Sequence, residues 1–175
     1  PDAIVGQFAG MPAVIAAAGP SLDKNVHVLS NLRNRALLIA VDTALKTLLP
    51  LGIEPHFAVT TDPTPAKACH FRDVVLPEET VFAFAPDGCP EIVEPFRRHP
   101  RKLVLFDNSN WYNEYLRRYL GLNCLLPRAM HVGEAAIRLA IAMGCDPIVL
   151  AGFDLGLPPD SEATHAKASA RALPI

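Results

Sequence analysis

The stretch that most constrains the fold is PAVIAAAGPSLD, residues 12–23. A run of small and aliphatic residues over 13–18 ends at a corner formed by Gly19, Pro20 and Ser21. The run suits a strand that is buried on both faces, and its alanines leave room for a ligand to approach the backbone. Glycine permits a tight turn, and Pro followed by Ser is a start signal for a helix, in which Ser caps free N–H groups. The sequence therefore predicts strand, turn and helix in succession.

A helix that starts directly after a buried strand presents unpaired N–H groups and the positive end of the helix dipole. Phosphates and carboxylates bind at such turns. We therefore predict an anion site at Ala18, Gly19, Pro20 and Ser21.

Short apolar runs and helix-like patterns alternate along the rest of the chain. The later strands are predicted at 36–41, 57–61, 80–85, 102–106, 123–126 and 148–151, and the helices at 22–32, 43–51, 91–98, 110–120 and 132–143. This alternation is typical of parallel strands joined by right-handed crossovers. The predicted fold class is α/β: a Rossmann-like open parallel sheet with helices on both faces.

Length and composition limit the domain organisation. The chain has 175 residues, of which 50% are hydrophobic and 19% charged, and these values fit one folded domain and exclude a disordered chain. Because the chain starts at Pro1 without a methionine, we expect a single Rossmann-like domain over 1–175 taken from a longer multidomain protein. The Pro- and Ala-rich end, residues 157–175, is predicted to be mobile or to belong with a neighbouring domain.

Charge, hydropathy and cysteine spacing exclude several functions. The formal net charge of −2 argues against a nucleic-acid partner. The apolar runs are far shorter than the roughly 20 residues that span a bilayer, so we expect no membrane span and a cytoplasmic location. The four cysteines form no C-x-x-C pair, so reduced thiols are expected rather than a zinc or redox site.

Polar residues follow most of the predicted strands. Asp42, Asp62, Asp87 and Asp154 each stand at a strand end, and Asn108 follows another. The carboxyl ends of parallel strands share one edge, where open α/β sheets bind ligands. Aspartate is also a favoured helix cap, and this alternative is strongest for Asp42 and Asp87.

Two of these aspartates lie in longer polar segments. We predict that Asp62 and Asp154 contact substrate or a cation. Asp42, about 20 residues beyond the glycine turn, is a candidate for a ribose hydroxyl, as in dinucleotide sites. Gly19 alone is not a G-x-G-x-x-G pattern, so a dinucleotide cofactor is only weakly indicated.

Two histidines are candidates for the same edge. His165 follows the last strand by a short loop, and a neutral imidazole there can accept a proton from a hydroxyl. The alternative is an exposed loop histidine. His131, just before the helix at 132–143, is expected to cap or pack, with a place near the edge as the alternative. The other histidines, His27, His56, His70 and His99, are expected to be surface or structural residues.

Neither the spacing of metal-binding residue types nor the aromatic residues identify a function. No spacing of His, Cys and carboxylate residues resembles a transition-metal site, whereas a hard cation such as Mg²⁺ is compatible with the edge carboxylates. The aromatic cluster at 111–115 follows a predicted strand and has two interpretations, a stacking platform for a ring or, more commonly, part of the core.

The sequence resembles a known family in four blocks. They are PAVIAAAGPSLD (12–23), IAVDTALK (39–46), GIEPHFAVTTD (52–62), and GFDL (152–155) with THA (164–166). In this order they resemble the central domain of the bacterial motility accessory factors (Maf proteins) and the MptE-like 6-hydroxymethylpterin diphosphokinases of the same superfamily. Phe153 departs from the Maf pattern, which often carries Gln there, and Ala17 stands where the similar Gly-x-Gly-Pro-Ser-Leu turn of bacterial sialyltransferases has its first glycine.

The resemblance implies one of two chemistries. Maf proteins are linked to the transfer of a nonulosonic acid, such as pseudaminic or legionaminic acid, from its CMP-activated form to Ser or Thr hydroxyls of flagellin. Their central domain is similar to bacterial sialyltransferases, in which a Gly-Pro-Ser-Leu turn lies by the CMP moiety and a histidine is the catalytic base. The diphosphokinase branch instead transfers pyrophosphate from ATP, with Mg²⁺, to a pterin alcohol.

Our leading hypothesis is the glycosyltransferase, because a Thr-His segment follows the Gly-Phe-Asp segment. The expected partners are a CMP-sugar donor and flagellin as acceptor, with Mg²⁺ as an optional cofactor. The assigned roles are catalysis for His165 and Asp154, nucleotide binding for Ala18, Gly19, Pro20, Ser21 and Asp42, and contact with substrate or cation for Asp62 and Asn108. The alternatives are the pterin diphosphokinase and a non-catalytic scaffold of the flagellum.

Overall fold

The structure is a computed structural model, and it describes eight segments of the chain. These are residues 4–32, 35–85, 88–94, 103–105, 115, 118–119, 129–156 and 164–169. Asp87, Asn108, the aromatic residues 111–114, the predicted strand at 123–126 and most of the predicted helix at 110–120 lie outside them.

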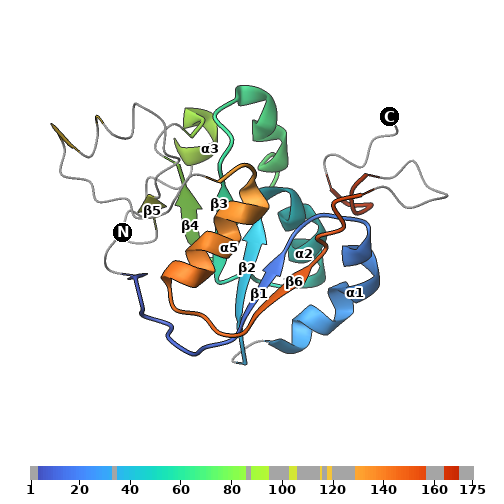
Figure 1. Ribbon diagram of the computed structural model, residues 1–175. Helices are drawn as coiled ribbons and strands as arrows, with labels where there is room; N and C mark the ends of the chain where they lie inside the picture. Colours follow the sequence, from blue (N-terminus) through green and yellow to red (C-terminus); the bar gives the residue numbers. More distant parts are fainter. Residues whose placement is uncertain are drawn as a thin grey trace.

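The described strands form one parallel sheet, with the order β5-β4-β3-β2-β1-β6 (Figure 1). Its strands are β1 (Ala13–Ala16), β2 (Leu37–Val41), β3 (Phe57–Thr60), β4 (Val81–Phe84), β5 (Leu103–Leu105) and β6 (Ile148–Ala151). Every residue of β1, β2 and β3 is buried, as the uncharged runs predict for strands covered on both faces. At the edge of the described sheet, Val149 and Leu150 of β6 are 50% and 48% exposed.

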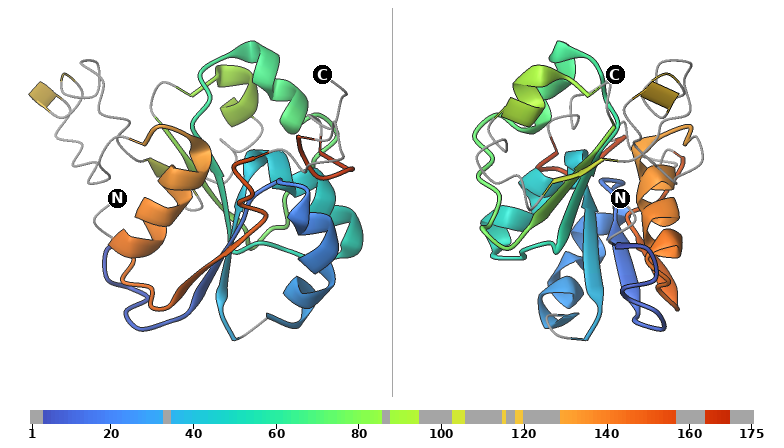
Figure 2. Two further views of the ribbon diagram at one scale, coloured as in Figure 1. Left: turned by 45° about the vertical axis from the view of Figure 1, so that its right-hand side comes forward. Right: turned by 90° about the vertical axis from the view of Figure 1, so that its left-hand side faces the viewer.

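Helices cover both faces of the sheet. The helix α5 (Val132–Ala142) packs on β1, β2 and β3, whereas α1 (Ser21–Leu29) and α2 (Leu45–Leu48) lie on the opposite face (Figure 2). The other helical elements are α3 (Pro90–Val93) and the 3₁₀ turns η2 (Ser30–Leu32), η3 (Asp42–Ala44), η4 (Leu49–Leu51) and η5 (Pro65–His70). The predicted fold class, a Rossmann-like open parallel sheet with helices on both faces, is confirmed.

The predicted helix at 43–51 is divided into η3, α2 and η4. Pro50 lies in the last of these turns, and a proline has no N–H for an α-helical hydrogen bond. Gly52 then ends the segment in the left-handed conformation, with φ of 69°. In the described segments no helix has the length and hydropathy that crossing a membrane requires.

The strand order places a ligand-binding position between β1 and β6. From β1 to β5 each strand is added on the same side, and the chain then returns through α5 to place β6 on the other side of β1. Open α/β sheets bind ligands at the carboxyl ends of strands where the order reverses in this way. The fold therefore points to the loops that follow β1 and β6.

The structure corrects one prediction about the C-terminal part. Residues 164–169 do not belong to a mobile end, because they dock on the turn after β1. Ala166 is fully buried, and its N–H donates to the carbonyl of Ala18 at 2.7 Å. The Lys167 N–H donates to Oδ2 of Asp23 at 3.0 Å. Sequence patterning missed this docking because both donors of the docked segment are backbone N–H groups, which carry no residue-specific signal.

Candidate functional site

A cavity of about 270 Å³ opens at the carboxyl ends of β1 and β6. Its walls come from the turn after β1, the loop after β6, the start of α5 and the docked segment 164–169. The residues at its walls include Ala18, Gly19, His131, Phe153, Asp154 and His165. Four residues that the sequence predicts as site residues therefore meet there: Ala18, Gly19, Asp154 and His165.

The turn after β1 and the loop after β6 fit closely against each other. A Cβ on Gly19 would overlap the Asp154 carboxylate, and a Cβ on Gly152 would overlap the carbonyl of Ala17. Gly152 also has φ of 74°, a conformation that side chains disfavour. Both glycines are needed to bring the two loops together.

Two backbone donors of this turn are already engaged. The Gly19 N–H donates to the carbonyl of Gly152 at 2.8 Å, and the Ser21 N–H donates to Oδ2 of Asp154 at 2.8 Å. Pro20 occupies the N-cap position of α1, so Ser21 is the first helical residue rather than its cap. The expectation that Ser21 caps this helix is therefore wrong, because a carboxylate from the loop after β6 takes that role.

His165 lies at the wall of the cavity because Ala166 anchors its segment. Its Nδ1 and the hydroxyl oxygen of Thr164 are 2.8 Å apart. When the ring donates from Nδ1 to Thr164, the lone pair of Nε2 is left to accept a proton. Partial burial lowers the pKa of His165 below its ordinary value of 6.5, which favours the neutral ring that a general base requires.

His131 begins α5 and lies at the wall of the same cavity. Its Nδ1 accepts from the Glu134 N–H at 3.1 Å, and the Glu134 carboxylate accepts from the Met130 N–H at 2.7 Å. The pair is a reciprocal cap of the helix start. Because Nδ1 is an acceptor here, the neutral ring carries its proton on Nε2. Both roles that the sequence left open, the cap and a place at the edge, therefore hold for His131.

Asp42 is buried beside the cavity rather than in its wall. It is 3% exposed, and its two carboxylate oxygens accept from the Thr60 hydroxyl at 2.8 Å and the Thr43 N–H at 2.7 Å. Burial, the largest influence, raises the pKa of Asp42. Its neighbours Val41 and Thr43 line the cavity instead.

Asp62 is not among the residues that line the cavity. Asp62 accepts at Oδ1 from the Thr64 hydroxyl at 3.0 Å and is close enough to Asp42 to disfavour its charged form. Asn108 lies outside the described residues. Within the described segments, no three His, Cys, Asp or Glu side chains are grouped so as to hold a metal ion.

Two wall features escaped the sequence analysis. A Cβ on Gly133 would lie 2.7 Å from the Phe153 ring and 3.2 Å from Nδ1 of His131, so this glycine lets both rings pack over the start of α5. The sequence shows only a glycine in the first turn of a helix, which by itself carries no such signal. The hydroxyl of Thr164, which orients His165, became identifiable only from its contact.

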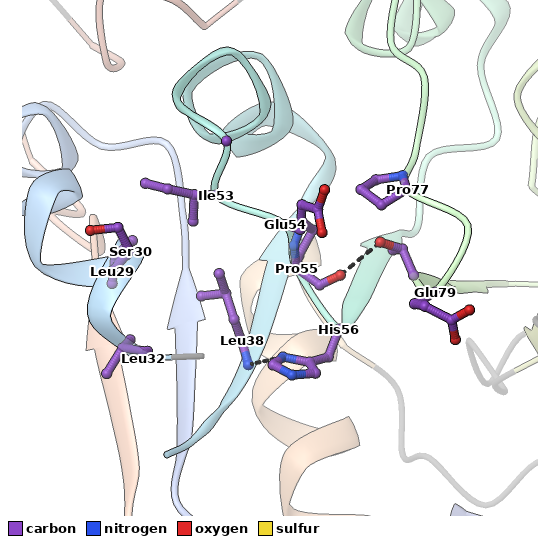
Figure 3. A pocket seen from close by; sticks show the side chains of 12 residues that line it. Leu29, Ser30, Leu32, Leu38, Ile53, Glu54, Pro55, His56, Pro77 and Glu79 are labelled. Atoms are coloured by element: carbon purple, nitrogen blue, oxygen red, sulfur yellow. Dashed lines mark hydrogen bonds between the residues drawn. The ribbon is translucent and has the colours of Figure 1, made fainter. Parts of the chain in front are cut away.

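A second cavity, of about 240 Å³, lies at the opposite, amino ends of the strands (Figure 3). There Nδ1 of His56 accepts from the Leu38 N–H at 2.9 Å, and the Thr80 hydroxyl donates to the Pro55 carbonyl at 2.7 Å. None of the predicted site residues lines it. These polar groups serve to join β2, β3 and β4 at their starts.

Comparisons with known proteins agree with this fold. Residues 2–160 match the family described as "6-hydroxymethylpterin diphosphokinase MptE-like". No curated protein matches the chain. A similar solved structure is that of the MAf glycosyltransferase from Magnetospirillum magneticum AMB-1, with 22% identity and a TM-score of 0.74. The match covers 90% of this chain and 25% of that one, so the chain spans about a quarter of the length of that protein.

Proposed function

The chain belongs to the MptE-like family, and from this premise we propose that it is a glycosyltransferase domain that uses a nucleotide sugar. The donor is a CMP-activated nonulosonic acid and the acceptor a Ser or Thr hydroxyl, with flagellin as the acceptor protein. One observation carries the proposal: the docked segment 164–169 brings His165 into the cavity that Gly19 and Asp154 also line.

In the proposed reaction, Nε2 of His165 takes the proton of the acceptor hydroxyl. The hydroxyl oxygen then forms a bond to the anomeric carbon of the sugar. The bond from that carbon to the phosphate oxygen breaks, and CMP leaves with the electron pair. Thr164 holds the ring in the orientation that leaves Nε2 free to accept.

The other predicted residues have supporting parts in this proposal. Ala18 and Gly19 form the wall against which the nucleotide packs, since both line the cavity. Ser21 acts through its hydrogen bond to Asp154, which fixes the loop after β6. Asp42 does not contact the ligand in this proposal, because it is buried beside the cavity and already bonded to Thr60 and Thr43.

A second candidate is the pterin diphosphokinase, which the description of the matching family favours. Here ATP with Mg²⁺ would be the donor, and His165 would take the proton of the pterin alcohol. Both reactions need a hydroxyl nucleophile and a phosphate-bearing donor, so this cavity suits either. They differ in the nucleotide that binds.

A panel of nucleotides in a thermal-shift assay separates the two candidates. We expect CMP to raise the melting temperature and ATP with Mg²⁺ to leave it unchanged. Stabilisation by ATP and Mg²⁺ alone would support the diphosphokinase, and no response to any nucleotide would favour a scaffold. The variant His165→Asn is expected to keep the CMP shift and to lose about 100-fold or more in transfer rate, the typical contribution of a general base.

The pH dependence provides an independent check on His165. The neutral ring is the active form, and its pKa lies below 6.5. The transfer rate of the wild type should therefore fall to half its maximum only at a pH below 6.5. At higher pH the rate should stay constant. A half-maximum above pH 6.5 would contradict the role of a partly buried histidine as the base.

A further inference from the structure

Two of the donors that a phosphate could use at the turn after β1 are already occupied. The N–H groups of Gly19 and Ser21 are bonded within the protein, and Pro20 has no N–H. A side-chain donor from another wall of the cavity would therefore add to what this turn offers a ligand with an oxyanion. The described wall residues that carry a polar hydrogen on the side chain are Thr43, His131, Thr164 and His165.

His131 differs from the other three in having a fixed donor. His165 must accept a proton rather than donate one in the proposed reaction. The hydroxyl of Thr164 accepts from Nδ1 of His165 and keeps its own proton, and Thr43 has a hydroxyl as well, but both are neutral groups whose O–H direction can rotate. His131 is held by its bond from the Glu134 N–H, which places the proton of the neutral ring on Nε2.

The start of α5 also leaves room for the ring. Gly133 has no Cβ, and this allows the Phe153 ring and Nδ1 of His131 to lie close over the first turn of α5. Phe153 and His131 both line the cavity. The imidazole is oriented by its hydrogen bond from the Glu134 N–H, and His131 remains exposed.

We propose that His131 is a second functional histidine of this cavity, whose Nε2–H donates to an oxyanion of the bound donor. The oxyanion is either a phosphate oxygen of the nucleotide or the carboxylate of the nonulosonic acid. This inference rests on the proposed function. It assigns the two histidines opposite parts: His165 accepts a proton, and His131 donates a hydrogen bond to negative charge.

The test must separate ligand contact from helix capping. His131→Asn keeps an N-cap acceptor for the Glu134 N–H but is too short to replace Nε2, and His131→Asp keeps the cap and adds negative charge. His27→Asn, on an exposed part of α1, is the matched control. The ligand-free melting temperature of both His131 variants should equal that of the wild type.

Calorimetry with cytidine, CMP and a CMP-nonulosonate then gives the result. If His131 binds phosphate, His131→Asn should weaken CMP about 10-fold to 100-fold, the typical effect of one hydrogen bond to a charged group, and leave cytidine unchanged. If it binds the sugar carboxylate, CMP should be unchanged and the CMP-sugar weakened by that factor. His131→Asp should weaken the affected ligand more than His131→Asn does.

Two results would overturn the inference while leaving the proposed function intact. One is wild-type affinity of both His131 variants for all three ligands, and the other is an equal loss for cytidine and CMP. Failure of the wild-type protein to bind CMP or the CMP-sugar would instead remove the proposed function, and the inference with it.

Discussion

At the residue scale, the site depends on positions where a side chain is absent. Gly19, Gly133 and Gly152 each allow a neighbouring group to approach the backbone more closely than a Cβ would permit. Gly52 is different, because it has φ of 69° but nothing within 4 Å of the place where a Cβ would be. Substituting alanine at these glycines therefore separates two destabilising effects, the strain of a left-handed backbone and the steric overlap of the new Cβ.

We predict that Gly152→Ala destabilises the protein by about 2 kcal/mol more than Gly52→Ala does. Both substitutions force alanine into a left-handed conformation, which costs roughly 1 to 2 kcal/mol. At Gly152 the Cβ would also overlap the carbonyl of Ala17 and push the loop after β6 away from β1. Urea unfolding of the two variants measures the difference in the free energy of unfolding. Equal decreases would contradict the prediction, because they would show that the loop after β6 moves to accommodate the Cβ without loss of stability.

At the element scale, the helices α1 and α5 both have their starts capped by side chains, but from different distances along the chain. The start of α5 is capped locally by His131, three residues before its partner Glu134. The start of α1 is capped by Asp154, which lies 133 residues away from Ser21 in sequence. The second cap ties β6 to the first helix, so the two loops form one wall.

Substitution of Asp154 should show that it positions the loop through a hydrogen bond. Asp154→Ala is expected to lower the free energy of unfolding by about 0.5 to 2 kcal/mol, the usual range for a lost N-cap. Asp154→Asn keeps an oxygen acceptor for the Ser21 N–H and should cost less. Chemical denaturation measures both. If the Asn variant lost as much stability as the Ala variant, the negative charge rather than the hydrogen bond would be the stabilising feature.

At the scale of the whole molecule, segments distant in sequence assemble the cavity. The strand order reverses beside β1, which places the loop after β6 next to the turn after β1. The segment 164–169 then returns to that turn and is held by the bonds of Ala166 and Lys167. His165 reaches the cavity only through this docking.

We predict that Ala166→Asp detaches the docked segment, because a carboxylate cannot be buried unpaired at this site. Hydrogen exchange at the Lys167 and Ser169 amides should rise, and the transfer rate should fall about as far as in His165→Asn, at least about 100-fold. The CMP thermal shift should persist. Ala168→Asp is the matched control, because Ala168 is exposed in the same segment. Unchanged exchange in the Ala166 variant would refute the docking.

The sequence determined the fold class by itself. Uncharged apolar runs are typical of buried parallel strands. In the structure the run over 13–18 contains β1, and the glycine corner and a helix follow it, as predicted. The sequence also predicted that Ala18, Gly19, Asp154 and His165 lie at one edge of the sheet, and these four residues line the same cavity, because residues that follow parallel strands share one edge.

Only the tertiary structure decided what the opening turn does. The sequence presents Gly19-Pro20-Ser21 as a free anion site, since helix-start donors have no partner within their own segment. In the folded chain a carbonyl from Gly152 and the carboxylate of Asp154 already satisfy Gly19 and Ser21. Such partners come from the loop after the neighbouring strand β6, which is distant in sequence, and no local pattern encodes them. We place a further hydrogen-bond donor for the ligand at another wall of the cavity, at His131.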